Sequence, residues 1–426
     1  MSRRFTDGLS IWMAVAIGLA VSTGHPAGFI AATAMPLACL APTKRPFAFR
    51  NAMGYYGAGL WPMIPGLYRY LQNSTSTLMP VLIWAASSVL LAIPWAVAWM
   101  PDRRLHYLWR IPLTIAAAIV PPLGLIGFIS PISGAGYLFP GTGWAGLVAT
   151  VFLPAILFAL CDVSAGEFRI YLRLALAAIV VMALGSHAGG PSDVAPPRNW
   201  EAVSTHFGDV SRPVQNYVAA DSMQRHIAQS SAHVLIYPES VVPRWSEATS
   251  EFWRETLIRS RRRGQILAIG AGLPRNDWDL GAFNFASEIK ALQVSELASS
   301  TTPAVVMGHE SFDNVLLLLG SQSAAFYQRI PIPIGMWRPF EHDGVPLRIN
   351  GPGVIAIDKQ RAAVLICYEQ ILTYPVLASM VQKPTILLGI SNSYWFNGTP
   401  IPRYQRSAMR AWANLFHLPF LLAINS

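Results

Sequence analysis

Long apolar stretches alternate with short polar segments through the first 186 residues. Seven stretches approach the length of about 17 to 25 residues that a helix needs to cross a bilayer. The pattern therefore predicts a multi-span α-helical membrane domain over residues 1–186, with about seven helices. The apolar stretches are residues 9–24, 27–42, 52–68, 77–100, 111–130, 143–161 and 171–186.

The pattern changes after this apolar part. Residues 187–199 are rich in Gly, Pro and Ser, which predicts a linker. Beyond the linker, short runs of β-branched residues alternate with helix-like segments, and this alternation predicts a layered α/β domain over residues 200–426. One helix is bracketed clearly by Ser246 as its N-cap and by Gly264 after its last arginine.

Composition supports the membrane interpretation and weakens a nucleic-acid one. The chain is 53% hydrophobic and only 12% charged, whereas soluble domains carry about 25% charged residues. The formal net charge of +9 is +7 in residues 1–186, from 11 basic and 4 acidic side chains, and +2 in the remainder, from 20 and 18. The basic excess thus lies in the apolar half, where a DNA-binding surface is not expected.

The basic residues also predict an orientation. If the N-terminus is cytoplasmic, ten Lys and Arg residues fall in the cytoplasmic segments and Arg69 alone falls outside, a strong positive-inside bias. Seven crossings would then place residues 200–426 in the periplasm of a bacterial inner-membrane protein. The ten residues are Arg3, Arg4, Lys44, Arg45, Arg50, Arg103, Arg104, Arg110, Arg169 and Arg173.

Disulfides and bound metals are not expected. Cys39 and Cys161 lie inside apolar runs, so Cys367 is the thiol expected to face water. The nine histidines include no HExxH motif and no repeated ligand spacing. We therefore expect no metal and no other cofactor.

Reactive side chains follow two of the predicted strands. The apolar run Val234–Ile236 leads to Glu239, and the run Ala363–Ile366 leads to Cys367 with Glu369 two residues later. In α/β sheets, sites are built at the carboxyl ends of strands. A thiol becomes a useful nucleophile when a base or a positive field helps it to ionise, and Glu239 is a candidate base.

These segments resemble the nitrilase superfamily. The resemblance rests on YPESVVP around Glu239, LICYEQIL around Cys367 and LLGISNSYWF after it. It implies an αββα sandwich with a Glu-Lys-Cys triad, in which Glu239 is the general base, Cys367 the nucleophile and Glu369 an additional acid. Together with the apolar half, the architecture is similar to apolipoprotein N-acyltransferases and to membrane proteins of plasmid conjugal transfer.

The chain departs from the family pattern at the lysine segment. Arg329 stands where the resemblance requires the lysine, and Met336 stands where it requires a glutamate, after a one-residue shortening. An arginine can hold a thiolate or an oxyanion, but it does not readily release a proton. The chain also ends at Ser426, before the final strands and closing membrane helix expected of the acyltransferases.

Two functions remain open from the sequence, and a transporter is a weaker third because the apolar helices carry few ionisable residues. The first is Cys367-dependent acyl transfer or amide hydrolysis on a membrane phospholipid, lipoprotein or peptide, with Arg329 holding the oxyanion. The second is a non-catalytic scaffold that assists conjugation proteins. Tyr368, Trp395 and Phe396 are candidate substrate contacts, although Trp395 and Phe396 could equally pack in the core.

Overall fold

The computed structural model describes residues 3–71, 78–101, 104–162, 166–188, 193–275, 311–340 and 344–426. Residues 283–289 and 301–308, whose sequences predict two further strands of the α/β domain, lie outside the described residues, as does Arg103.

The chain forms two compact units that are discontinuous in sequence. The helical unit comprises residues 1–195, 370–378 and 395–420, and the α/β unit comprises residues 196–369, 379–394 and 421–426. The change after residue 195 falls inside the predicted linker, residues 187–199. After residue 369 the chain passes into the helical unit at residues 370–378 and again at residues 395–420. The domain boundaries predicted from the sequence do not include these two passages, and they stay a prediction.

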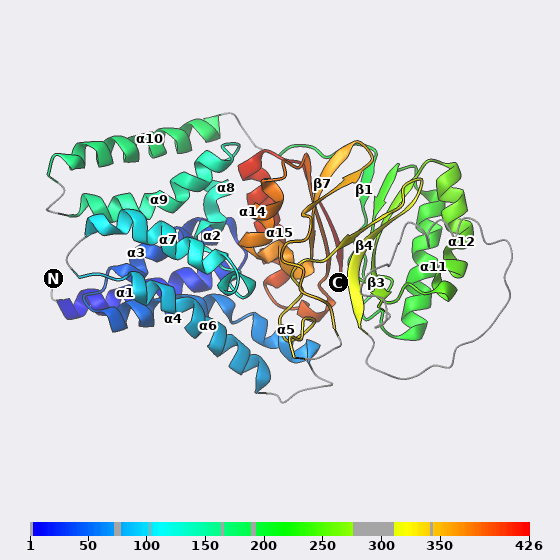
Figure 1. The fold of residues 1–426 in the computed structure, drawn as a ribbon, viewed down its shortest axis with the longest axis horizontal. Coiled ribbons are helices and arrows are strands. Elements are labelled where there is room, and N and C mark those ends of the chain that lie inside the picture. The colour runs from blue at the N-terminus through cyan, green and yellow to red at the C-terminus, as the bar shows by residue number, and fades with distance from the viewer. Residues whose placement is uncertain are drawn as a thin grey trace. The chain divides into compact units, whose positions relative to one another are not determined.

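The helical unit begins with a bundle of apolar helices (Figure 1). Prolines at the first or second positions of α2, α3, α4 and α6 are compatible with helix starts, where the missing N–H has no intrahelical partner. The helices are α1 (Arg3–Ser22), α2 (Pro26–Ala32), α3 (Met35–Leu40), α4 (Arg45–Leu60), α5 (Met63–Tyr70), α6 (Met79–Ala98), α7 (Tyr107–Ile119), α8 (Ala135–Leu138), α9 (Trp144–Leu160) and α10 (Phe168–Ala188).

Two of these helices, α6 and α10, are long and apolar enough to cross a membrane. The predicted span 27–42 is instead divided between α2 and α3, and the predicted span 52–68 between α4 and α5. The predicted span 111–130 is not one helix, because α7 stops at Ile119 before Pro121 and Pro122 and a short 3₁₀ helix follows at Leu123–Leu125. Among the described residues, seven full-length crossings are therefore not confirmed.

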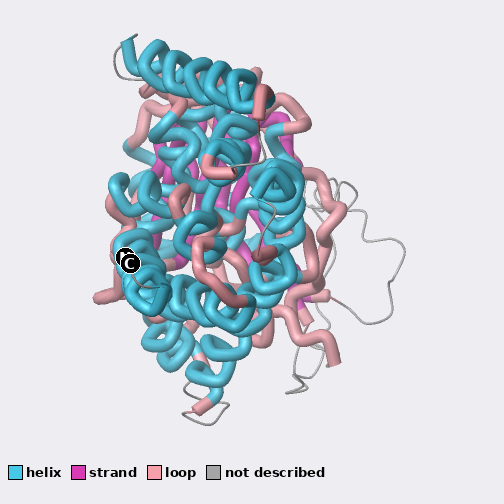
Figure 2. The backbone as a smooth tube through the Cα atoms, turned by 90° about the vertical axis from the view of Figure 1, so that its left-hand side faces the viewer, coloured by secondary structure: helices cyan, strands magenta, loops and turns pink. Residues whose placement is uncertain are grey.

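Helix α10 lies along one edge of the helical unit, at the top of Figures 1 and 2. It packs against α9, and Leu172 is its one buried residue. Apolar side chains therefore cover most of its free surface, which is unusual for a helix in contact with water. The exposed apolar residues are Phe168, Ile170, Tyr171, Leu174, Val180, Val181 and Leu184.

The helical unit also contains segments from the far end of the chain. Residues 370–378 include most of α14 (Thr373–Met380), and residues 395–420 include α15 (Ile401–Phe416). The 3₁₀ helices η1 (Arg104–His106), η2 (Leu123–Leu125) and η3 (Pro131–Gly134) complete the connections between the apolar helices.

The first sheet of the α/β unit has the order β1-β2-β3-β4-β5 (Figure 1). Its first three strands are parallel, and β4 and β5 are added antiparallel. The strands are β1 (Trp200–Ala202), β2 (Val234–Ile236), β3 (Ile266–Pro274), β4 (Phe312–Gly320) and β5 (Ala324–Tyr327).

The second sheet has the order β6-β7-β8-β9, with β7 and β8 parallel. Its strands appear with those of the first sheet in magenta in Figure 2. They are β6 (Val354–Ile357), β7 (Gln360–Ile366), β8 (Ile386–Asn392) and β9 (Phe420–Asn425).

Two apolar layers hold the α/β unit together. One layer lies between the sheets and contains Val234 and Ile236 of β2 together with Val364 and Ile366 of β7. The other layer joins the opposite face of the first sheet to α11 (Pro213–Gln229) and α12 (Glu247–Arg262). A helix layer and two face-to-face sheets are therefore present within this unit, in agreement with the α/β class predicted from the sequence.

Candidate active site around Cys367 and Glu239

Glu239 lies in the turn that follows β2, and its side chain is buried. The neighbouring strand β3 approaches this turn closely at Gly270. A Cβ atom on Gly270 would overlap the backbone oxygen of Pro238 and would lie 2.5 Å from the Cα of Glu239. The glycine thus allows the turn to lie directly against the sheet, where the carboxylate is shielded from water.

Cys367 begins the 3₁₀ helix η5 (Cys367–Ile371) directly after β7. Its φ angle is 51°, a left-handed conformation that costs a residue with a side chain about 1 to 3 kcal/mol unless its surroundings hold it. The chain turns sharply at Cys367, so the thiol does not continue the alternation of side chains along β7. Strain of this kind at a reactive side chain is a feature of functional sites.

The thiol of Cys367 and the carboxylate of Glu239 are hydrogen-bonded to each other. Glu239 Oε1 accepts a bond of 2.7 Å from Asn314 Nδ2, and Oε2 accepts one of 2.9 Å from the backbone N–H of Asn392. The N–H groups of Asn392 and Tyr368 are also directed at the sulfur. The acid and the thiol are therefore held together from several elements of the α/β unit.

Burial affects both groups in the same direction. It raises the pKa of Glu239, against the opposing effect of its hydrogen bonds from Cys367, Asn392 and Asn314. Burial, followed by the nearby Glu239 carboxylate, raises the pKa of the Cys367 thiol well above its ordinary value. The thiol is therefore protonated at neutral pH, so a reaction at sulfur requires the ionised Glu239 carboxylate to take the proton as the sulfur attacks.

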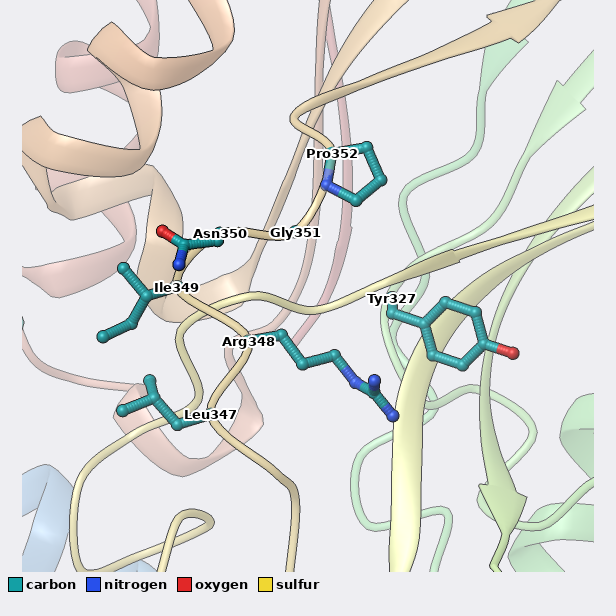
Figure 3. A pocket seen from close by; sticks show the side chains of 7 residues that line it. All are labelled: Tyr327, Leu347, Arg348, Ile349, Asn350, Gly351 and Pro352. Atoms are coloured by element: carbon teal, nitrogen blue, oxygen red, sulfur yellow. The ribbon is translucent and has the colours of Figure 1, made fainter. Parts of the chain in front are cut away.

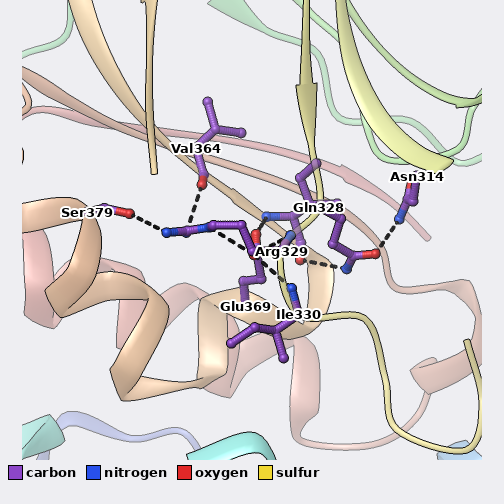
Figure 4. Close-up of polar contacts among 8 residues, drawn as sticks. Asn314, Gln328, Arg329, Ile330, Val364, Glu369 and Ser379 are labelled. Atoms are coloured by element: carbon purple, nitrogen blue, oxygen red, sulfur yellow. Dashed lines mark hydrogen bonds and ion pairs between the residues drawn. The ribbon is translucent and has the colours of Figure 1, made fainter. Parts of the chain in front are cut away.

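Arg329 forms a buried ion pair with Glu369, with 3.2 Å between Nε and Oε1. Its terminal nitrogens reach Ser379 Oγ at 3.1 Å and the carbonyl oxygen of Val364 at 3.4 Å (Figure 4). The structure thus brings Arg329 to Glu369, and the oxyanion role expected from the sequence stays a prediction.

Glu369 accepts three backbone N–H groups from two segments of the chain, in addition to its pairing with the arginine. Its Oε1 accepts the N–H groups of Arg329 at 2.9 Å and Ile330 at 3.2 Å, and its Oε2 accepts the N–H of Ile366 at 2.9 Å. Ile366 immediately precedes Cys367. Glu369 is consequently a residue that positions the Cys367 turn, because the turn is tied through it to the segment after β5.

Gln328 occupies the place beside Glu239 that was expected for Arg329. Its Oε1 accepts a bond of 3.0 Å from Asn314, whose amide also donates to Glu239, and its Nε2 donates to the Ile366 carbonyl at 3.2 Å. Figure 4 shows Gln328 and Arg329 extending in opposite directions. The sequence contained a signal for this arrangement, because alternate residues of a strand share a face and Phe326 is a core position.

The three candidate substrate contacts fall into different units. Tyr368 is buried in the α/β unit, where its backbone N–H points at the sulfur. Trp395 and Phe396 belong to the helical unit. There Trp395 packs edge-on against Tyr70 at 5.6 Å between ring centroids, and Phe396 packs against Gly66. Both side chains thus have packing partners within the helical unit, and their role as substrate contacts stays a prediction.

The expectation about cysteine exposure was wrong. Cys161 is exposed, while Cys367 and Cys39 are buried. Cys161 follows the last turn of α9, where the helix has ended and the side chain is released to solvent. No cluster of three or more metal-ligating side chains occurs among the residues that the structure describes.

A surface pocket of about 390 Å³ lies beside Arg348 (Figure 3). Arg348 pairs with Asp313 at 3.0 Å and lies 5.0 Å from the centre of the Tyr327 ring. Tyr327 packs on the helix-covered face of the first sheet, whereas Cys367 belongs to the layer between the sheets. The pocket is therefore separate from the Cys367–Glu239 pair. Its lining residues are Tyr327, Leu347, Arg348, Ile349, Asn350, Gly351 and Pro352.

The chain is similar over nearly its full length to two conjugal transfer proteins. It is 26% identical over 429 residues to the probable conjugal transfer protein TraB of Sinorhizobium fredii, covering 97% of this chain and 96% of the relative. It is 25% identical over 448 residues to the conjugal transfer protein TraB of Agrobacterium fabrum, covering 99% of this chain and 94% of the relative. No protein-family model matches the chain.

Solved structures give a weaker likeness. An amidase of the nitrilase superfamily from Nesterenkonia superposes with a TM-score of 0.33 at 14% identity, covering 53% of this chain and 74% of that chain. Another structure of an amidase from Nesterenkonia gives a TM-score of 0.30 at 15% identity, with the same coverage. Scores this low do not establish a shared fold, so the candidate site rests on its own geometry.

Proposed function

We propose that this chain is a membrane protein of plasmid conjugal transfer that carries out Cys367-dependent acyl transfer or amide hydrolysis. The observation that carries this proposal is the hydrogen bond between the Cys367 thiol and the buried Glu239 carboxylate. A nucleophile within hydrogen-bond reach of a base, on a strained turn at a strand end, is the arrangement that covalent catalysis requires. The substrate class is an ester or amide carbonyl of an envelope lipid, lipoprotein or peptide.

The proposed reaction proceeds in two steps. Glu239 takes the thiol proton as the sulfur of Cys367 bonds to the carbonyl carbon, and the protonated acid then gives this proton to the departing amine or alcohol. Water or an amine next attacks the resulting thioester, again losing its proton to Glu239, and the thiol is regenerated. Glu369 and Arg329 position the turn from which the sulfur attacks.

The membrane placement rests on the helical unit. Helices α6 and α10 have the required length and apolarity, and α10 exposes apolar side chains over most of its surface. We propose an inner-membrane protein with a cytoplasmic N-terminus and the α/β unit in the periplasm, which requires the seven crossings predicted from the sequence. It is supported by the concentration of basic residues on alternate connections. Alkaline phosphatase fused after Asn425 should then be active in intact cells, and an inactive fusion would contradict this orientation.

The role in conjugation is inferred from the full-length similarity to the two TraB proteins. We expect Cys367→Ala to reduce plasmid transfer at least a hundredfold in a mating assay, because it removes the nucleophile while leaving Glu369 and its backbone contacts in place. Cys161→Ala is the matched control, since this exposed thiol lies outside the candidate site. The control should transfer the plasmid normally.

A second candidate function is a non-catalytic scaffold of the conjugation machinery. It is favoured by the neighbours of Glu239, because the amide of Asn314 donates both to Glu239 and to Gln328. The nearby Arg329 pairs with Glu369. The same mating assay separates the two functions, because a scaffold keeps its transfer frequency in Cys367→Ala at unchanged protein level.

A further inference from the structure

Helix α15 is amphipathic, and its polar face carries a row of arginines. Arg403, Arg406 and Arg410 are exposed, and their spacing of three and four residues places them along one face of the helix. We call these three residues the α15 arginine row. At a rise of about 1.5 Å per residue the row extends about 10 Å along the helix. No ion pair within the described part of the chain involves these arginines.

Two residues fix α15 to the helical unit: Tyr404 on its buried face and Ser407 beside the arginine row. Tyr404 stacks on Phe29 with ring centroids 4.8 Å apart, and its hydroxyl donates to the Phe128 carbonyl at 2.6 Å. Ser407 Oγ donates to the Gly24 carbonyl at 2.6 Å, and the Tyr137 hydroxyl donates to the Ser407 carbonyl at 2.9 Å. The helix therefore cannot turn its arginine row inward without breaking these contacts.

The contact partners of α15 all lie at one end of the bundle. Gly24 follows α1, Phe128 follows α7, and the N–H of Gly143, which precedes α9, donates to the Leu415 carbonyl at 2.7 Å. The end of α10 reaches the same place, because His187 Nε2 lies 3.2 Å from the Tyr137 carbonyl. Helix α15 thus lies across the end of the bundle at which α1, α7 and α10 finish and α9 begins.

An exposed tryptophan lies at this end of the bundle. Trp144, the first residue of α9, is 44% exposed and packs against Phe416 of α15 at 5.2 Å between ring centroids. Exposed tryptophans at the ends of apolar helices are enriched at the level of the lipid headgroups. Asp193 also belongs to this part of the unit, near Tyr137, so the α15 arginine row and this acid together carry a net charge of +2.

We propose that the α15 arginine row binds the phosphates of anionic phospholipids at the membrane surface. Guanidinium groups bind phosphate oxygens in a forked geometry, and arginines at headgroup level gain favourable electrostatic energy from anionic lipids. Arg410 also lies 5.9 Å from the centre of the Phe420 ring, a contact that leaves its charge without an acidic partner among the described residues. The row would fix the α15 end of the bundle to one leaflet. This inference rests on the proposed membrane placement and is independent of any reaction at Cys367.

The test measures phosphatidylglycerol bound to the full-length chain in detergent by native mass spectrometry. In Arg403→Gln/Arg406→Gln/Arg410→Gln the apparent affinity should fall about tenfold or more, because each arginine near a lipid surface contributes to attraction. The matched control is Arg259→Gln/Arg261→Gln/Arg262→Gln, which removes the same charge from exposed positions of α12 in the α/β unit. The control should bind lipid as the unmodified chain does.

Each outcome decides a separate point. Lipid binding by the α15 variant at the level of the unmodified chain would overturn the proposal and would leave an acidic protein surface as the partner of the row. The same loss of affinity in both triple variants would overturn it too, because the lower total charge alone would explain the loss. Recovery of the unmodified chain in the soluble fraction would instead contradict the membrane placement. Gln is used because it retains helix propensity, so unchanged thermal unfolding is expected in both triple variants.

Discussion

Glu369→Ala should lower the free energy of unfolding of the α/β unit by about 5 kcal/mol or more, a large fraction of the stability of a typical domain. The substitution leaves the backbone N–H groups of Arg329, Ile330 and Ile366 buried without their acceptor. Each buried donor that loses its partner costs about 1 to 3 kcal/mol. It also leaves the Arg329 guanidinium buried without its carboxylate.

Removal of the arginine should cost less. In Arg329→Met the Glu369 carboxylate keeps its three backbone donors, so we expect a loss of about 3 kcal/mol, the lower end of the range for breaking a buried pair. The order of the two losses follows from the hydrogen-bond geometry. A simple ion-pair account would assign similar losses to the two substitutions.

Urea unfolding of the full-length chain in detergent, followed by circular dichroism, measures both losses. Glu255→Ala supplies the matched control, because Glu255 pairs with Arg259 on the exposed surface of α12. Exposed pairs of this kind contribute about 0.3 to 0.5 kcal/mol. If Arg329→Met were the more damaging substitution, Glu369 would not be the residue that positions the Cys367 turn.

Glu239→Gln should slow acylation of Cys367 by roughly a hundredfold to ten-thousandfold, the usual contribution of a general base. The side chain keeps its size but can no longer take the thiol proton. A suitable probe reaction is acylation by p-nitrophenyl butyrate, followed by the initial burst of nitrophenolate. The exposed Cys161 is replaced by serine in every protein, so that the exposed thiol does not contribute.

The same reaction has an expected pH dependence. Glu239 acts as a base only when ionised, so the acylation rate should be high above the pKa of Glu239 and should fall as the pH drops through that value. Because burial raises this pKa above its ordinary value of 4.5, the midpoint should lie above pH 4.5. Glu239→Gln should lack this transition. A rate that rises only in parallel with ionisation of a free thiol would contradict a role for Glu239.

Local sequence patterns predicted the parts of the structure that local physics decides. The β-branched runs before Glu239 and Cys367 form β2 and β7, because a buried strand needs a continuous apolar segment. The helix bracketed by Ser246 and Gly264 is α12, and Ser246 Oγ accepts the Thr249 N–H as its N-cap. Both strand ends lie at the candidate site, where Glu239 and Cys367 meet.

Tertiary context decided the features that the sequence did not predict. Gln328 and Arg329 are adjacent, and only the register of the segment after β5 determines which of them faces Glu239. The assignment of α15 to the helical unit depends on contacts such as that of Ser407 with Gly24, nearly the whole chain apart in sequence. Hydropathy likewise did not reveal that the stretch 27–42 divides into two short helices.

The most direct test of the central claim is the intact mass of the Cys161→Ser chain after incubation with p-nitrophenyl butyrate. The account predicts one added butyryl group, located at Cys367 by peptide mapping and absent when Cys367→Ala is introduced into the same chain. The buried Cys39 should remain unmodified in both proteins. An unmodified Cys367, or equal acylation of the chain with and without it, would contradict the account.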